Sequence, residues 1–180
     1  MIYAALLRWI NVGGNNKVDM KKLKTSFESL GFEQIVTYIN SGNVIFKTDR
    51  ADIKNITTEI EVKIFADFGF MIKVLVREKA DLIGICENVP ESWINDTCMK
   101  CDVLFLWDEV DDPSVLNSLN LIQGVDTAFY FPGAVIWSLD RQNYNQSAIS
   151  KFVKSPVYPK MTARNINTVR KILEIMQSIN

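Results

Sequence analysis

The residues best suited to chemistry in this sequence surround a diglycine turn near the N-terminus. Gly13 and Gly14 follow an apolar run and precede a helix-like pattern, so their amides stand where a strand gives way to a helix. Glycine permits positive φ and close backbone approach, and the free N–H groups and dipole at a helix start attract anions. Arg8 and Lys17 add positive charge on either side. The turn therefore predicts a site for a phosphate or carboxylate group.

The spacing of this turn differs from the two common phosphate-binding fingerprints. Neither G-x-x-x-x-G-K-[ST] nor G-x-G-x-x-G occurs in the segment. A purely conformational role is an equally good interpretation, because glycines are frequent in tight turns that need φ > 0. Both readings stay open on the sequence alone.

Several kinds of active site are excluded by composition. Histidine is absent, which removes Ser-His-Asp and Cys-His catalysis and every His-ligated metal. Cys98 and Cys101 form a CxxC pair, but Cys101 leads into a strand-like segment instead of opening a helix, the context that activates such thiols. We therefore expect no metal and no cofactor, and we leave open whether the protein is an enzyme.

Cysteine usage and hydropathy indicate the compartment. The three cysteines are an odd number, which argues against a disulfide framework and for a reducing environment. The apolar start of the chain has no basic leader, and no apolar run reaches the length of a membrane span. We expect a soluble cytoplasmic protein without a membrane partner.

Charge is balanced overall at −1 but unevenly distributed. Residues 102–112 include five acidic residues, whereas residues 141–171 include seven basic residues and no acidic one. Such runs are usually solvated faces. The basic stretch leaves nucleic-acid binding as one alternative, although residues 3–7 are apolar on both alternating faces and an RRM-like sheet needs an open aromatic face. A protein-interaction module, monomeric or homodimeric through an edge strand or the final helix, is the other.

Apolar periodicity and turn residues predict the elements of residues 1–77 in the order β-α-β-β-α-β, the split βαβ or ferredoxin-like arrangement. The predicted elements are a strand at 2–8, a helix capped by Asp19, strands at 33–39 and 44–47, a helix capped by Asp52, and a strand at 71–76.

The predicted elements of residues 78–180 repeat this order incompletely. The predicted elements are helices at 80–86, 113–121 and 147–153, a loop at 90–100, a strand at 103–107, a hairpin at 127–131 and 134–139, and a final helix at 163–178 with Thr162 as its cap. The expected fold is α+β, with two ferredoxin-like halves of antiparallel sheet that divide after Arg77. The second half is less regular and ends in the long C-terminal helix.

The topology brings a second motif toward the diglycine turn. In a split βαβ sheet, the loop after the first strand and the turn between the second and third strands lie at the same end. That turn is Ser41-Gly42-Asn43, which is also ordinary hairpin chemistry.

Three motifs resemble those of a bacterial family known as domain of unknown function 1697. They are L-R-x-I-N-V-G-G-x-N-x-V-x-M at residues 7–20, Y-I-x-S-G-N-V-x-F at 38–46, and T-x-R-N-x-N-T-V at 162–169. The resemblance implies two ferredoxin-like halves and supplies no established activity. Trp9 stands where the family usually has glycine, Ile166 stands where it usually has tryptophan, and Ser147-Ala148-Ile149 replaces a common Ser-Lys-Leu run.

The polar residues of the three motifs form the predicted ligand site, which we expect to take a small anionic ligand on one shared rim. These residues are Arg8, Asn11, Gly13, Gly14, Asn16, Lys17, Ser41, Gly42, Asn43, Arg164 and Asn165.

Overall fold

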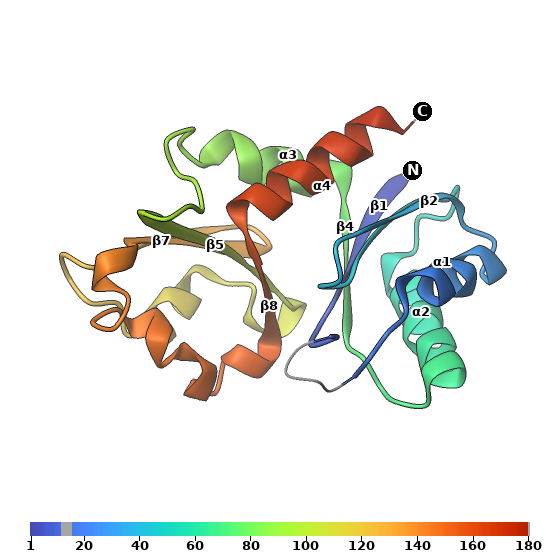
Figure 1. The fold of residues 1–180 in the computed structure, drawn as a ribbon, viewed down its shortest axis with the longest axis horizontal. Coiled ribbons are helices and arrows are strands. Elements are labelled where there is room, and N and C mark those ends of the chain that lie inside the picture. Colours follow the sequence, from blue (N-terminus) through green and yellow to red (C-terminus); the bar gives the residue numbers. More distant parts are fainter. Residues whose placement is uncertain (12–15, 180) are drawn as a thin grey trace. The chain divides into compact units, whose positions relative to one another are not determined.

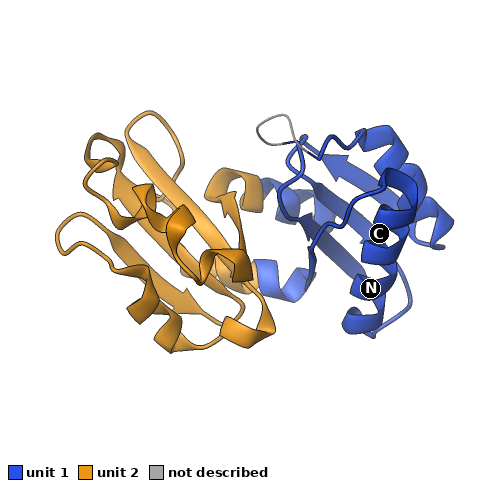
Figure 2. Ribbon diagram, turned by 90° about the horizontal axis from the view of Figure 1, so that it is seen from below, with its two compact units in different colours: residues 1–82, 171–180 blue, residues 83–170 orange. Residues whose placement is uncertain are grey.

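The computed structural model describes residues 1–11 and 16–179 of the 180-residue chain. The described elements form two four-stranded antiparallel sheets with helices, as the sequence predicted (Figure 1). The chain divides into two compact units (Figure 2). The first unit takes residues up to 82 together with the C-terminal residues from 171 onward, and the second takes residues 83–170. A division into two domains after Arg77 stays a prediction.

The first unit has the ferredoxin-like strand order β2-β3-β1-β4 with every neighbouring pair antiparallel. Its elements are β1 (Ile2–Leu7), α1 (Met20–Ser29), β2 (Glu33–Tyr38), β3 (Asn43–Lys47), α2 (Ile53–Phe68) and β4 (Val74–Glu78). The last strand begins later than the predicted Met71, whose side chain is exposed.

The core of the first unit lies between α1, α2 and one face of the sheet. Tyr3, Ala5 and Leu7 of β1 pack in one apolar cluster with Phe27 of α1 and Ile60 of α2. Ala4 and Leu6, which point to the other face, are buried as well. Both faces of β1 are therefore covered, which fits the apolar run and leaves no open RRM-like platform on this strand.

The ends of both helices follow the sequence prediction. The Oδ1 atom of Asp19 accepts from the backbone N–H of Lys22 at 2.8 Å, and Oδ1 of Asp52 accepts from that of Asn55 at 3.0 Å. Each aspartate satisfies an N–H that the helix itself leaves without a partner. Gly69 ends α2 with a φ of 80°, a left-handed conformation that glycine adopts without strain.

The second unit repeats the strand order of the first, with the order β6-β7-β5-β8. Its sheet has a hairpin at one side and a strand paired with β5 at the other, all antiparallel. The chain elements here are α3 (Lys79–Asn88), β5 (Met99–Leu106), β6 (Thr127–Phe131), β7 (Ala134–Asp140), β8 (Met161–Asn165) and α4 (Ile166–Ser178), of which α3 and α4 have residues in both units.

The connections of the second unit correct three sequence predictions. The predicted helix at 113–121 is a 3₁₀ helix at Pro113–Leu119, and the predicted helix at 147–153 consists of two short 3₁₀ turns. The final helix begins at Ile166, because residues 161–165 form β8 and pair with β5. The five residues of β8 show too little apolar alternation to predict a strand. Their extended conformation is stabilised by the hydrogen bonds with β5.

The cap of the final helix is accordingly a different residue. Asn165 accepts a hydrogen bond from the backbone N–H of Thr168 at 2.9 Å through Oδ1, whereas Thr162 lies inside β8. In the part of the chain that the structure describes, no helix has the length and apolarity needed to cross a bilayer.

Candidate functional site

The segment after β1 packs against the turn between β2 and β3, as the topology predicted. The backbone N–H of Leu7 donates to the carbonyl of Gly42 at 2.8 Å, and Nδ2 of Asn11 donates to the carbonyl of Asn40 at 2.9 Å. The two motifs therefore lie side by side at one end of the first sheet.

Asn11 closes the loop that leads into α1. Its side chain makes two contacts with Val18: Oδ1 accepts from the backbone N–H at 2.9 Å, and Nδ2 donates to the carbonyl at 3.1 Å. Its own backbone N–H donates to the carbonyl of Asn16 at 3.1 Å. The amide of Asn11 is thus used within the protein, where it fixes both ends of the loop. Gly13 and Gly14, the predicted amide donors, lie outside the described residues.

Left-handed backbone recurs along this short segment. Trp9, Asn11 and Asn16 have φ values of 61°, 55° and 48°. Asparagine tolerates this region because its side chain can bond locally, and Nδ2 of Asn16 donates to the carbonyl of Trp9 at 3.1 Å. For a bulky residue the conformation is uncommon and costs energy. A glycine at position 9 would adopt this conformation without that cost.

Arg8 and Trp9 interact with each other. The guanidinium carbon of Arg8 lies 4.6 Å from the centroid of the Trp9 ring, a cation–π contact. Arg8 is half-buried and Trp9 is exposed. The indole therefore lies against the predicted cationic group of the loop.

A hollow of about 640 Å³ opens at the start of α1. It is lined by Asn11 and Asn40 from the two motifs and by Lys17, Asp19 and Lys21. Neither lysine forms an ion pair with another described residue, whereas Asp19 is engaged as the helix cap. The formal charge of these lining side chains is one positive, which favours an anion over a cation.

The side chain of Asn43 holds the Ser41-Gly42-Asn43 turn together. Nδ2 of Asn43 donates to the carbonyl of Tyr38 at 3.0 Å and to Oγ of Ser41 at 3.1 Å. Gly42 and Asn43 are buried and Ser41 is half-buried. These contacts are those of a structural turn, the alternative that the sequence left open.

Arg164 and Asn165, the C-terminal pair of predicted site residues, belong to the second unit. The Arg164 side chain is buried, and Nη1 donates to Oγ1 of Thr162 at 3.1 Å and to the carbonyl of Ala163 at 2.8 Å. Burial lowers the pKa of this guanidinium to about 10. Asn165 caps α4. A rim shared by this pair and the N-terminal loop stays a prediction.

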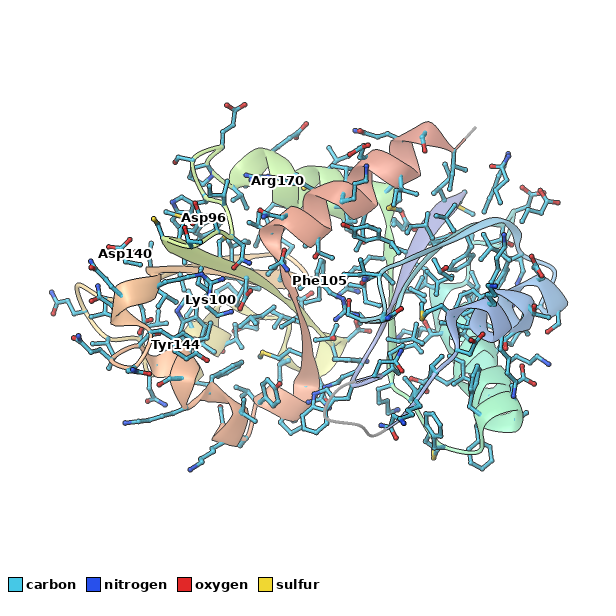
Figure 3. All side chains as sticks on the ribbon, viewed as in Figure 1. Asp96, Lys100, Phe105, Asp140, Tyr144 and Arg170 are labelled. Carbon is cyan, nitrogen blue, oxygen red and sulfur yellow. The ribbon has the colours of Figure 1, made fainter. Side chains whose placement is uncertain are left out.

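Most of the basic stretch has structural partners. On α4, Nη1 of Arg170 donates to the carbonyl of Trp93 at 2.8 Å, and Nη2 to that of Pro90 at 3.1 Å (Figure 3 labels Arg170). Lys151 and Lys154 are exposed and form no ion pair with a described residue. The other engaged cations are Arg141 with Asn95, Lys160 with Glu109, Lys171 with Glu174, and Arg164 as above.

The two cysteines of the CxxC pair differ in exposure. Cys98 is exposed, whereas Cys101 is fully buried on β5. Burial, reinforced by the nearby carboxylate of Asp102, raises the pKa of Cys101 to about 12. Such a thiol is a poor nucleophile near neutral pH. Within residues 1–11 and 16–179, no group of three acidic or cysteine side chains is placed to hold a metal ion.

Asp126 has a role that sequence reasoning missed. Its Oδ1 accepts from Nε1 of Trp137 at 3.0 Å and from the Ser147 hydroxyl, while Oδ2 accepts from the backbone N–H groups of Ile122 at 2.8 Å and Ala148 at 3.1 Å. Burial alone would raise the pKa of Asp126, but these hydrogen bonds outweigh it and lower the pKa. Three of the four donors lie 11 to 22 residues along the chain from Asp126, so no local motif marks this carboxylate.

The comparisons with known proteins agree with the fold. The solved structure of a conserved bacterial protein, SP0830 from Streptococcus pneumoniae, is 29% identical to this chain with a TM-score of 0.83, and the match covers 97% of this chain and 98% of that one. No curated protein matches the chain. The model of the family described as "Protein of unknown function (DUF1697)" matches residues 1–137. With about three quarters of its length inside that match, the chain belongs to the DUF1697 family.

Proposed function

We propose that this protein binds a small ligand bearing a phosphate or carboxylate group at the loop between β1 and α1. The observation that carries the proposal is the hollow at the start of α1, with Lys17 and Lys21 on its wall. Neither lysine is in an ion pair with a described carboxylate, so no such pair has to break when an anion binds. The first turn of the helix adds the favourable end of its dipole.

The surrounding contacts hold the two described ends of this loop. Asn11 joins the loop to Val18 and to Asn40, and the Gly42 carbonyl binds the end of β1. Residues such as Asn11 and Lys17, whose neighbours are fixed in this way, lose less conformational entropy on binding. In the proposal, Arg8 supplies further charge, while Asn16 and the amides of Gly13 and Gly14 complete the contacts.

The proposal is one of binding and names no reaction. The described lining residues include no cysteine, serine, threonine or histidine, and in this proposal the two lysines supply charge while Asp19 caps the helix. The three cysteines are free thiols, which supports a reducing, cytoplasmic setting for this function.

The test is a thermal-shift screen of inorganic phosphate, nucleotides, sugar phosphates and small carboxylates. A ligand at 100 times its Kd should stabilise the folded protein by about 2.7 kcal/mol. Replacing Lys17 and Lys21 together by glutamine should remove most of that gain. Lys24→Gln, an exposed lysine on the same helix outside the hollow, should preserve it. An equal thermal shift in the double variant and the control would contradict the proposed site.

A further inference from the structure

A second hollow, of about 380 Å³, lies in the second unit and matches none of the predicted site residues. One wall is the end of the 3₁₀ helix at Pro113–Leu119 with the loop that follows it, and the other is formed by residues 146–156. Its volume is in the range of sites for small organic molecules. Its apolar lining residues are Leu119, Ile122, Ala148, Phe152 and Pro156.

The two walls are held together by Asp126. Its carboxylate accepts from the N–H of Ile122 on one wall and from the N–H of Ala148 and the hydroxyl of Ser147 on the other. Ser147 is almost fully buried, and its hydroxyl oxygen also accepts from the N–H of Ile149 at 3.1 Å. Both walls are therefore anchored to one carboxylate, so the hollow is formed before any ligand binds.

The charged side chains that line this hollow are both positive. Lys151 and Lys154 line it, both are exposed, and neither forms an ion pair with a described residue. No described lining residue is acidic. Asp126 is not among the lining residues, and its two oxygens accept from four donors. An apolar surface beside two lysines is complementary to a molecule with an apolar body and one anionic end.

We infer that the second unit binds a small amphipathic carboxylate, with its apolar part against Phe152 and Leu119 and its carboxylate toward Lys151 and Lys154. A nucleic-acid strand fits less well, because most cations of the basic stretch already have partners and two lysines make few phosphate contacts. This site differs in unit and residues from the one proposed above, so either can fail without the other.

Trp137 provides a local reporter. Its ring lies 5.5 Å from that of Phe152 in an edge-on arrangement, and its indole N–H binds Asp126. A ligand against Phe152 should change the environment of this indole. The experiment titrates ¹⁵N-labelled protein with phenylacetate and hexanoate and with their neutral analogues phenylacetamide and hexanamide, following the Trp137 indole signal and the Lys151 amide signal.

Saturable shifts at these two signals are expected with the carboxylates, and roughly tenfold weaker binding with the neutral amides. Replacing Lys151 and Lys154 by glutamine should weaken carboxylate binding to the level of the amides, while the Lys17 and Lys21 double variant should bind as the wild type does. Equal affinity for carboxylates and amides, an unchanged affinity after the Lys151 and Lys154 replacements, or no saturable shift at either signal would each overturn the inference.

Discussion

Gly42 shows how one residue supports the loop after β1. An added Cβ at this position would lie 2.8 Å from Cβ of Leu7 and 2.8 Å from Cδ1 of Ile10, and the backbone φ is 80°. Gly31 has nearly the same φ, 79°, but nothing lies within 4 Å of its added Cβ. Alanine at Gly31 would therefore lose stability through the backbone conformation alone, whereas alanine at Gly42 would also lose it through contact of the methyl group with Leu7 and Ile10.

The first prediction compares alanine at these two positions. Gly31→Ala should lower the free energy of unfolding by about 1–2 kcal/mol, the cost of a left-handed L-residue. Gly42→Ala should lower it by roughly 1–3 kcal/mol more, because the buried β1 end must also move. Urea unfolding of both variants measures the difference. Equal losses would show that the loop accommodates a methyl group next to Leu7.

For single residues, the sequence predicted hydrogen bonds between near neighbours in the chain but not those between residues far apart in it. Asp19 and Asp52 were identified as helix caps because a capping residue and its partner are three positions apart. Asn11 was assigned to a ligand, but its amide binds Val18 and Asn40. Asp126 was not singled out at all. Three partners of these two side chains, Asn40, Trp137 and Ser147, lie 11 to 29 residues away along the chain, so no short sequence spacing predicts these contacts.

Among the elements, β8 and α4 meet at Asn165, where the sequence placed a continuous helix. The second prediction concerns this junction. Asn165→Ala should cost about 1 kcal/mol of stability and speed hydrogen exchange at the Thr168 amide, because the side chain that accepts from this amide is removed.

Asn165→Asp is the matched control, since aspartate is as good a cap. It should keep both the stability and the protection of the Thr168 amide. Faster exchange in the aspartate variant as well would argue that Asn165 acts through something other than its capping oxygen.

The elements of the first unit were predicted more accurately than those of the second. Helices α1 and α2 carry clear apolar stripes, for example Ile56, Ile60 and Ile64 on α2. In the second unit, 3₁₀ segments replace the corresponding helices. The two three-residue 3₁₀ turns are too short to show a helical pattern. A five-residue strand such as β8 is defined by its partner more than by its own residues.

At the scale of the molecule, both units contain an aspartate whose folded pKa is lowered. In the first, the hydroxyl of Ser26 donates to Asp67 at 2.6 Å and is the main cause. In the second, burial opposes the shift at Asp126 but its hydrogen bonds prevail. The unfolded chain therefore binds protons more readily than the folded chain at these positions, and acid favours unfolding.

The third prediction follows from the lowered pKa values of Asp67 and Asp126 in the folded protein. The stabilisation from these carboxylates is fully present above their unfolded pKa of about 3.9 and is lost as the pH falls through the folded values. Urea unfolding should thus give a lower free energy at about pH 3 than at about pH 6. Asp126→Asn should be less stable at the higher pH and should lose less on acidification. An equal loss in this variant and the wild type would exclude Asp126 as a contributor.

The sequence by itself determined the family, the α+β class, the ferredoxin-like first half and the caps of its helices. Each of these depends on short-range periodicity, turn chemistry or motif residues. The tertiary structure decided that a short strand completes the second sheet, that Asn11 binds the carbonyl of Asn40, and that Asp126 joins the walls of a hollow. The physical reason is that strand pairing and buried hydrogen bonds join residues far apart in the chain, and only the folded chain brings those partners together.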